Sequence, residues 1–152
     1  MGYWLMKSEP SVFGIDDLAA LAGGTEHWDG IRNYQARNMI RDQMQPGDQA
    51  LFYHSSCDDP GVVGIMEIAS KAYPDPSALD PGSEYYDPKS TATAPRWFVV
   101  DVRFVRKLKR TIALPELKQQ PELSELALVR RGNRLSVMPV SAAQWEFILA
   151  LE

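Results

Sequence analysis

Short strand-forming runs recur along this chain, and their spacing limits the folds that it can adopt. The runs are Tyr3–Lys7, Gln49–His54, Val62–Ala69, Trp97–Lys107 and Leu135–Val140. In the fourth run, apolar side chains at alternating positions predict a strand with two distinct faces. Strands that follow one another closely favour antiparallel pairing into a curved sheet or small barrel. No Gly-rich phosphate loop follows a run, which argues against a Rossmann or P-loop domain.

Helix signals lie between these runs. A short helix is predicted over Ile15–Leu21, with its stop at Gly23 and Gly24. Asn33 is a suitable N-cap for a helix that reaches about Gln43. The core face of this second helix is predicted from its helical spacing and consists of Ala36, Met39, Ile40 and Met44.

Later segments complete an α+β pattern. Pro121 divides Leu114–Leu128 into two expected short helices, and Ser141 with Gln144 forms a capping box that opens a final helix. Between the strands, Pro74–Pro95 is a long stretch rich in Pro, Asp and Ser, and such loops are usually functional or mobile. The predicted fold class is therefore mixed α+β, a curved sheet or small pseudo-barrel flanked by short helices.

Composition is that of a soluble globular domain, with 152 residues, 45% hydrophobic and 24% charged. No apolar run has the length of a membrane span, and no secretory signal is visible at the N-terminus. One cysteine excludes an internal disulfide, and two histidines make a classical zinc site improbable. We therefore expect a cytoplasmic monomer without a metal or other cofactor and without a membrane partner.

Charge is unevenly distributed on this acidic chain, whose net charge is −4. That balance argues against coating long nucleic acid by charge alone. Basic residues nevertheless gather late in the sequence, so two interpretations stay open: a local basic face, or solvated faces with ordinary salt bridges. These late basic residues are Arg103, Arg106, Lys107, Lys109, Arg110, Arg130, Arg131 and Arg134.

The segment Trp28–Asn38 concentrates groups that recognise ligands, because it places aromatic rings, guanidinium groups and carboxamides beside Gly30. Aromatic faces stack on flat rings, carboxamides recognise donor and acceptor edges, and Arg binds anions. The pattern is typical of a pocket for a planar, hydrogen-bonding ligand such as a nucleobase. A turn with a core Trp followed by a capped helix explains the same residues.

Catalytic patterns are weak. His54 and Cys57 are three residues apart, but both lie at a strand end or in the loop after it, with no helix N-terminus to activate the thiol. We therefore expect no enzyme activity. Trp28 and Trp97 precede or begin ordered segments, where each ring is equally suited to lining a cleft or to anchoring the core.

Taken together, these segments resemble the EVE domain family. The resemblance is carried by Trp4–Pro10, Trp28–Asn38, Phe52–Ser55, Tyr85–Lys89 and Arg134–Val140, with Pro60–Gly64 and Pro95–Trp97 between them. It spans nearly the whole chain in order, so residues 1–152 are expected to form a single domain. Ser56 and Asp58 depart from the family pattern, in which an Asn and a basic residue are expected.

The resemblance implies a PUA-like fold, kinship with YTH and ASCH domains, and recognition of a modified base in DNA or RNA by an aromatic pocket. YTH domains hold N6-methyladenine in an aromatic cage. In this picture Trp28 stacks on the base, Asn33 and Ser8 contact its edge, and Arg32, Arg37 and Lys7 bind flanking phosphates. The candidate site residues implied by the resemblance are Lys7, Ser8, Trp28, Arg32, Asn33, Tyr34, Arg37, Tyr53, His54, Ser55 and Trp97.

Two rival hypotheses belong to other classes. The first is a sensor that binds a free nucleoside or organic ion in the same cavity. The second is a nucleic-acid-modifying enzyme that uses Cys57 or His54.

Overall fold

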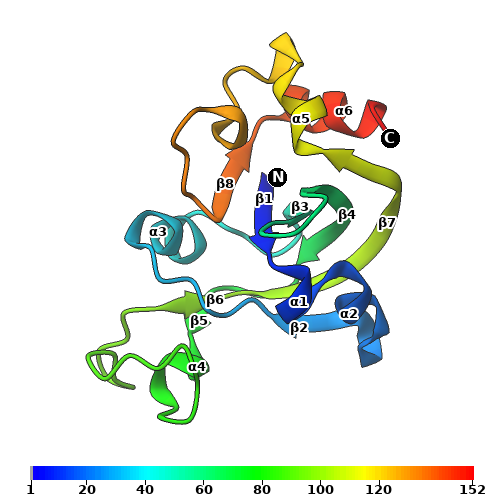
Figure 1. Cartoon of the computed structure of the whole chain (residues 1–152). Helices are drawn as coiled ribbons and strands as arrows, with labels where there is room; N and C mark the ends of the chain where they lie inside the picture. The colour runs from blue at the N-terminus through cyan, green and yellow to red at the C-terminus, as the bar shows by residue number, and fades with distance from the viewer. Residues whose placement is uncertain (1) are drawn as a thin grey trace.

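The computed structural model describes residues 2–152, which form a six-stranded sheet, a two-stranded sheet and several short helices (Figure 1). The predicted α+β class with a curved sheet is confirmed. The strands are β1 (Tyr3–Ser8), β2 (Thr25–His27), β3 (Gln49–His54), β4 (Gly61–Ile68), β5 (Tyr73–Pro74), β6 (Phe98–Val99), β7 (Asp101–Ala113) and β8 (Val137–Val140). The α-helices are α1 (Pro10–Phe13), α2 (Ile15–Ala20), α3 (Tyr34–Asp42), α4 (Pro76–Leu79), α5 (Leu114–Lys118) and α6 (Ala142–Ala150), and the 3-10 turns are η1 (Ala22–Gly24), η2 (Pro121–Leu123) and η3 (Ala127–Val129).

The larger sheet has the strand order β2-β7-β4-β3-β1-β8. Every neighbouring pair is antiparallel except β1 and β3, which are parallel, with Tyr3 beside Gln49 and Ser8 beside His54. The expectation of antiparallel pairing was therefore wrong for this pair. Its connection runs through α1, α2, β2 and α3, which is long enough for the crossover that parallel strands need.

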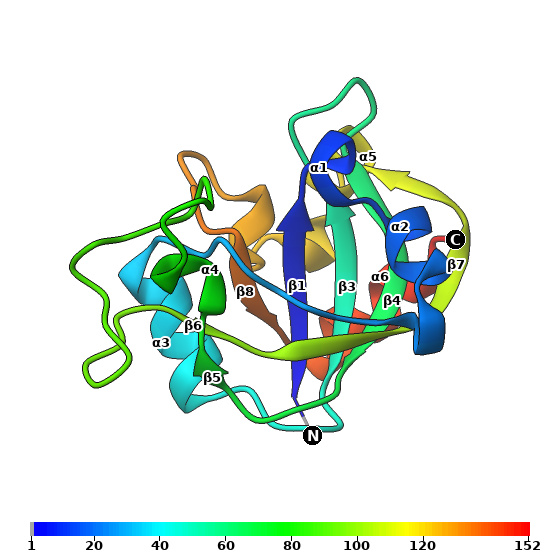
Figure 2. The ribbon, with the colours of Figure 1, turned by 90° about the horizontal axis from the view of Figure 1, so that it is seen from below.

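Curvature of the sheet comes from β4 and β7. Their register shifts between Val62 and Gly64 and again between Ile65 and Met66, and such bulges bend and twist a strand pair. A side chain at Gly64 would begin 2.7 Å from Ile15 Cδ1 and 3.0 Å from the Arg106 carbonyl, so only glycine allows this close approach. Figure 2 shows the result, with β7 curving around the side of the sheet past β4.

Two apolar cores cover the two faces of the sheet, because successive side chains of a strand point to opposite faces. Trp4 and Met6 of β1 lie in one core with α2 and α3, whereas Leu5 lies in the other. The second core includes Leu117, Leu123 and the α6 residues Trp145 and Ile148. The predicted capping box at the start of α6 is present, with Ser141 Oγ accepting from the Gln144 amide at 3.1 Å.

Several predicted boundaries differ from the structure. The run Trp97–Lys107 is divided at Val100, because β6 pairs with β5 in the small sheet while β7 pairs with β4 and continues to Ala113. Pro10 does not simply end β1 but begins α1 at its first helical position. Proline is tolerated there because an amide hydrogen at this position would have no acceptor within the helix. The short strand β2 was not predicted, and the last strand begins at Val137 rather than Leu135.

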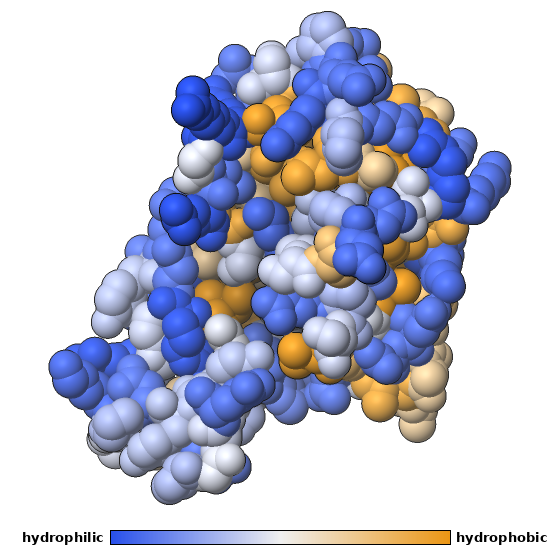
Figure 3. Space-filling view, in the orientation of Figure 1, coloured by the Kyte–Doolittle hydropathy of each residue, from blue (hydrophilic) through white to orange (hydrophobic). Residues whose placement is uncertain are grey.

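The predicted long loop forms a projecting segment, residues 75–97, which includes α4. Its two ends are joined by the Asp75 amide, which donates to the Trp97 carbonyl at 2.8 Å. Figure 3 shows that this segment, at the lower left, presents mostly hydrophilic residues on the visible face. Among residues 2–152, no helix has the length and apolar character to cross a membrane.

Candidate functional site

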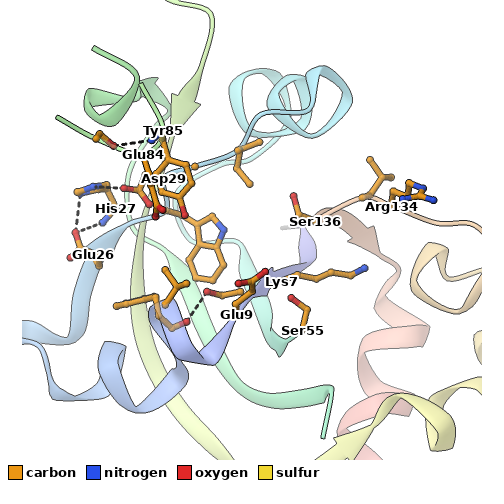
Figure 4. A pocket seen from close by; sticks show the side chains of 18 residues that line it. Lys7, Glu9, Glu26, His27, Asp29, Ser55, Glu84, Tyr85, Arg134 and Ser136 are labelled. Atoms are coloured by element: carbon orange, nitrogen blue, oxygen red, sulfur yellow. Dashed lines mark hydrogen bonds and ion pairs between the residues drawn. The ribbon is translucent and has the colours of Figure 1, made fainter. Parts of the chain in front are cut away.

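A cavity of about 720 Å³ lies beside the C-terminal end of β1. Its lining comes from five separate parts of the chain: residues 7–13, residues 26–31, Ser55, residues 83–85 and residues 134–136. Figure 4 shows the labelled side chains of these parts converging on one space. Four of the predicted site residues line it, namely Lys7, Ser8, Trp28 and Ser55.

Trp28 belongs both to the cavity and to the core. Its side chain is buried, and its ring meets Phe52 edge to face at 5.2 Å and Phe13 at 6.4 Å between centroids. Its amide donates to the Val100 carbonyl at 2.9 Å, which fixes the backbone against the sheet. The two interpretations of this ring, cleft lining and core anchor, are therefore both correct.

Gly30 allows Tyr85 to reach the cavity. Gly30 has φ +80°, and a Cβ there would begin 2.8 Å from Tyr85 Cζ, so the tyrosine ring lies directly against the glycine. A residue with a side chain would strain the backbone and displace the ring. Tyr85 comes from the projecting segment, which therefore forms part of the cavity wall.

Arg32 joins the projecting segment to the Trp28 segment. Its guanidinium donates to the Ile31 carbonyl at 2.8 Å, to Asp75 Oδ2 at 3.0 Å and to the Tyr85 carbonyl at 2.6 Å. Asp75 is buried and also accepts from the Gly30 amide at 3.2 Å. Burial alone would raise the pKa of Asp75, but hydrogen bonds from Ser77 and Arg32 lower it below its usual value. Arg32 thus has a structural role that the sequence did not reveal.

One wall of the cavity is acidic. Glu26, Asp29 and Glu84 lie on the same side with His27, as Figure 4 shows. Glu26 Oε1 lies 2.9 Å from His27 Nδ1, while Asp29 Oδ2 lies 3.5 Å from His27 Nε2. Burial raises the pKa of Asp29, and the charge of His27 opposes this effect.

The opposite side carries Lys7, Glu9, Ser55, Arg134 and Ser136 (Figure 4). Lys7 lies at the end of β1 with Nζ 5.8 Å from the centre of the Tyr53 ring, and burial lowers its pKa. Within residues 2–152, neither Lys7 nor Arg134 forms a salt bridge with a carboxylate. Two cations thus remain available to an anion here.

Most of the other late basic residues are neutralised by ion pairs. This agrees with the interpretation of solvated faces with ordinary salt bridges rather than a local basic face. Arg106 pairs with Glu152 at 2.6 Å and Arg110 with Glu116 at 2.7 Å. The remaining pairs are Lys107 with Asp16, Arg103 with Glu67 and Arg130 with Glu125. The exposed side of β7 is therefore a face of mixed charge rather than a basic patch.

Five predicted site residues lie outside the cavity lining, around the start of α3: Arg32, described above, and Asn33, Tyr34, Arg37 and Trp97. Asn33 Oδ1 caps this helix by accepting from the Ala36 amide at 3.0 Å, as the capping pattern predicted. Tyr34 stacks on Trp97 at 4.9 Å, and the Arg37 guanidinium lies 4.6 Å from the Tyr34 ring centre. Trp97 donates to Asp87 at 2.7 Å. Contact of these residues with a ligand stays a prediction.

Tyr53 and His54 also lie outside the cavity lining. Tyr53 is buried in the second core, and this burial raises its pKa to about 12. His54 points toward α2, where its Nε2 accepts from the Ile15 amide at 3.1 Å, and burial lowers its pKa. A neutral imidazole that accepts at Nε2 is engaged in structure rather than poised beside Cys57.

Sequence reasoning missed several residues that line the cavity, above all Asp29, Tyr85, Arg134 and Ser136. Tyr85 and Arg134 stand in segments that carried the family resemblance, and Asp29 follows Trp28 directly. Their place in those segments was the available signal. The prediction instead selected residues at the ends of strands and at the start of α3.

Comparison with known protein families gives one match over residues 2–151, to the family described as EVE domain. Thymocyte nuclear protein 1 of Danio rerio is 47% identical over 98% of this chain and 71% of its own length. Thymocyte nuclear protein 1 of Homo sapiens is 42% identical over 99% of this chain and 73% of its own length.

Solved structures agree with this fold. A protein from Pseudomonas syringae has a TM-score of 0.94 at 55% identity, covering 98% of each chain. Human THYN1 in complex with 5-methylcytosine-containing DNA has a TM-score of 0.92 at 42% identity, covering 99% of this chain and 97% of that one. The YTH domain of Zygosaccharomyces rouxii MRB1, bound to N6-methyladenosine RNA, has a TM-score of 0.57 at 16% identity over 99% of this chain and 85% of that one, and it shares the fold alone.

Proposed function

Because this chain belongs to the EVE domain family, we propose that it is a non-enzymatic domain that binds DNA or RNA by taking a modified base into the cavity beside Trp28. The cavity itself carries the proposal. It combines three aromatic side chains, Phe13, Trp28 and Tyr85, with two cations, Lys7 and Arg134. Neither cation has a carboxylate partner among residues 2–152. Aromatic groups contact a flat base, and cations bind the phosphates on either side of it.

A similar protein supports the same ligand class. Human THYN1, 42% identical over 99% of this chain, forms a complex with DNA that contains 5-methylcytosine. We therefore propose a cytosine-type modified base as the first ligand to test. The cytoplasmic location, the monomeric state and the single-domain organisation expected from the sequence stay predictions.

The affinity is expected to be modest and to depend on salt. Stacking of one base contributes about 1–3 kcal/mol, and each neutralised phosphate adds about 0.7–0.9 to the slope of log affinity against log salt concentration. Contacts from Lys7 and Arg134 therefore predict a slope of about −1.4 to −1.8. A sensor of free nucleosides would bind the mononucleoside equally well and show almost no slope.

Fluorescence titration with oligonucleotides tests the proposal. The panel contains unmodified cytosine, 5-methylcytosine, 5-hydroxymethylcytosine and N6-methyladenine in DNA and RNA, at two salt concentrations. We expect saturable binding of one modified base, which Trp28→Phe weakens. The matched control is Trp145→Phe, which replaces a Trp in the second core and is expected to leave binding unchanged. Absence of binding to every oligonucleotide by the folded protein would refute the proposal.

A catalytic role is tested separately. Cys57→Ser removes the thiol, and unchanged binding and an unchanged oligonucleotide after incubation are the expected results. The hydrogen bond from the Ile15 amide to His54 supports this expectation, because it occupies the ring nitrogen that a general base would use.

A further inference from the structure

The carboxylates of the acidic wall differ in how far their hydrogen-bonding capacity is already used. Glu26 Oε1 accepts from the His27 amide at 2.9 Å and lies 2.9 Å from His27 Nδ1. Glu84 is exposed at the outer end of the wall. Asp29 is half-buried in the cavity lining, and the ion pair that it forms within residues 2–152 is the long one with His27, at 3.5 Å.

Asp29 therefore has acceptor capacity that the protein leaves unused. An ionised carboxylate offers two oxygens and about four acceptor sites, and burial without donors is unfavourable for its charge. The raised pKa of Asp29 reflects this partial burial. A ligand that brings a hydrogen-bond donor to this wall satisfies the carboxylate, whereas a ligand that brings another acceptor repels it.

The two sides of the cavity also orient a nucleotide. Lys7 and Arg134 lie opposite the acidic wall and outnumber Glu9, the one labelled carboxylate on their side, so a phosphate is attracted to that side and repelled by Glu26, Asp29 and Glu84 (Figure 4). With its backbone on the cationic side, a base that enters the cavity directs an edge toward the acidic wall. Cytosine and adenine carry an exocyclic amino donor, whereas thymine, uracil and hypoxanthine carry an oxygen acceptor in its place.

On these observations, and on the basis of the proposed function, we propose that Asp29 is a specificity-determining residue that accepts a hydrogen bond from the exocyclic amino group of the bound base. The ligand class is then a base with an amino group, in preference to the oxo base of the same shape. Hydrogen bonding of Asp to the cytosine amino group is an established pairing in nucleic-acid recognition.

The test compares bases that differ in this one group. 5-Methylcytosine and thymine share the pyrimidine ring and the 5-methyl group, and differ in the amino or oxo group at position 4 with the linked proton at position 3. Each is placed opposite an abasic site in the same duplex, so that neither must break a base pair to leave the stack. Adenine and hypoxanthine form a second pair for the purine class.

The unaltered protein is expected to prefer the amino base about 10- to 100-fold within the pair that it binds. Asp29→Asn is expected to bring this ratio close to one, because a carboxamide either donates or accepts. Glu122→Gln is the charge-matched control, since it removes one negative charge from an exposed position on η2, outside the cavity lining, and it is expected to keep the ratio.

Equal affinity of the unaltered protein for the amino and oxo bases would overturn the inference, and this comparison needs no variant to fold. A ratio that persists in folded Asp29→Asn would also overturn it. Both outcomes leave the proposed function standing, because binding of the modified base still occurs. Failure to bind any modified oligonucleotide is a different result and counts against the proposed function itself.

Discussion

Replacing Arg32 with methionine is expected to destabilise the fold rather than to weaken phosphate binding. The variant removes three hydrogen bonds of 3.0 Å or shorter, to Ile31, Asp75 and Tyr85, while keeping an unbranched side chain of similar reach. It leaves the Asp75 carboxylate buried without a cation. Loss of one partner of a buried pair costs about 3–5 kcal/mol, and the donors from Ser77 and Gly30 that remain on Asp75 reduce this to about 3 kcal/mol.

Urea unfolding at neutral pH measures this loss, and thermal unfolding is expected to show a midpoint lower by about 6–12 °C. The matched control is Arg41→Met on α3, whose exposed guanidinium contacts Asp42 at 2.8 Å, and it is expected to leave stability essentially unchanged. A stability loss below about 1 kcal/mol for Arg32→Met would refute the reasoning. So would a decrease of about one in the salt slope of DNA binding, because that decrease is typical of a lost phosphate contact.

Three further changes probe the cavity and its support. Trp28→Ala is expected to cost about 3–5 kcal/mol in urea unfolding, because it empties a packed position against Phe52, whereas binding is best measured in Trp28→Phe. Gly30→Ala is expected to cost about 1–3 kcal/mol and to weaken binding by displacing Tyr85, and an unchanged unfolding midpoint would contradict the close contact. For His54, burial lowers the pKa of the folded state below the unfolded value of about 6.5, so its contribution is complete above that pH and is lost as the pH falls below it. His54→Gln should therefore flatten the decline in stability below about pH 6.5, as measured by urea unfolding at a series of pH values.

Local signals in the sequence were sufficient to predict much of the fold. The strand β3 was predicted with its exact bounds, and Asn33 and Ser141 cap their helices as expected, because these features depend on neighbouring residues. The break at Val100 was not predictable in this way. It arises because β6 and β7 pair with different strands, and apolar alternation does not show which strand is the partner.

The candidate site was predicted less completely for the same physical reason. Trp28 and Lys7 line the cavity as expected of residues at a strand end and a ring-rich turn. Arg32 was assigned to phosphate because a guanidinium alone does not reveal its partner, and Asp75 lies 43 residues further along the chain. Tyr85 reaches the cavity because Gly30 has no side chain, a dependence between two distant positions that composition and periodicity do not contain.

The position of β1 inside the sheet has a consequence for synthesis on the ribosome. Its neighbours are β3 and β8, and Tyr3 lies beside Val140, so the first strand keeps an unpaired edge until β8 has emerged. Residues 134–136, which form part of the cavity wall, immediately precede β8 and arrive equally late. Pairing between such distant segments also slows folding. The cavity of a nascent chain is therefore incomplete until residues 134–140 have left the ribosome.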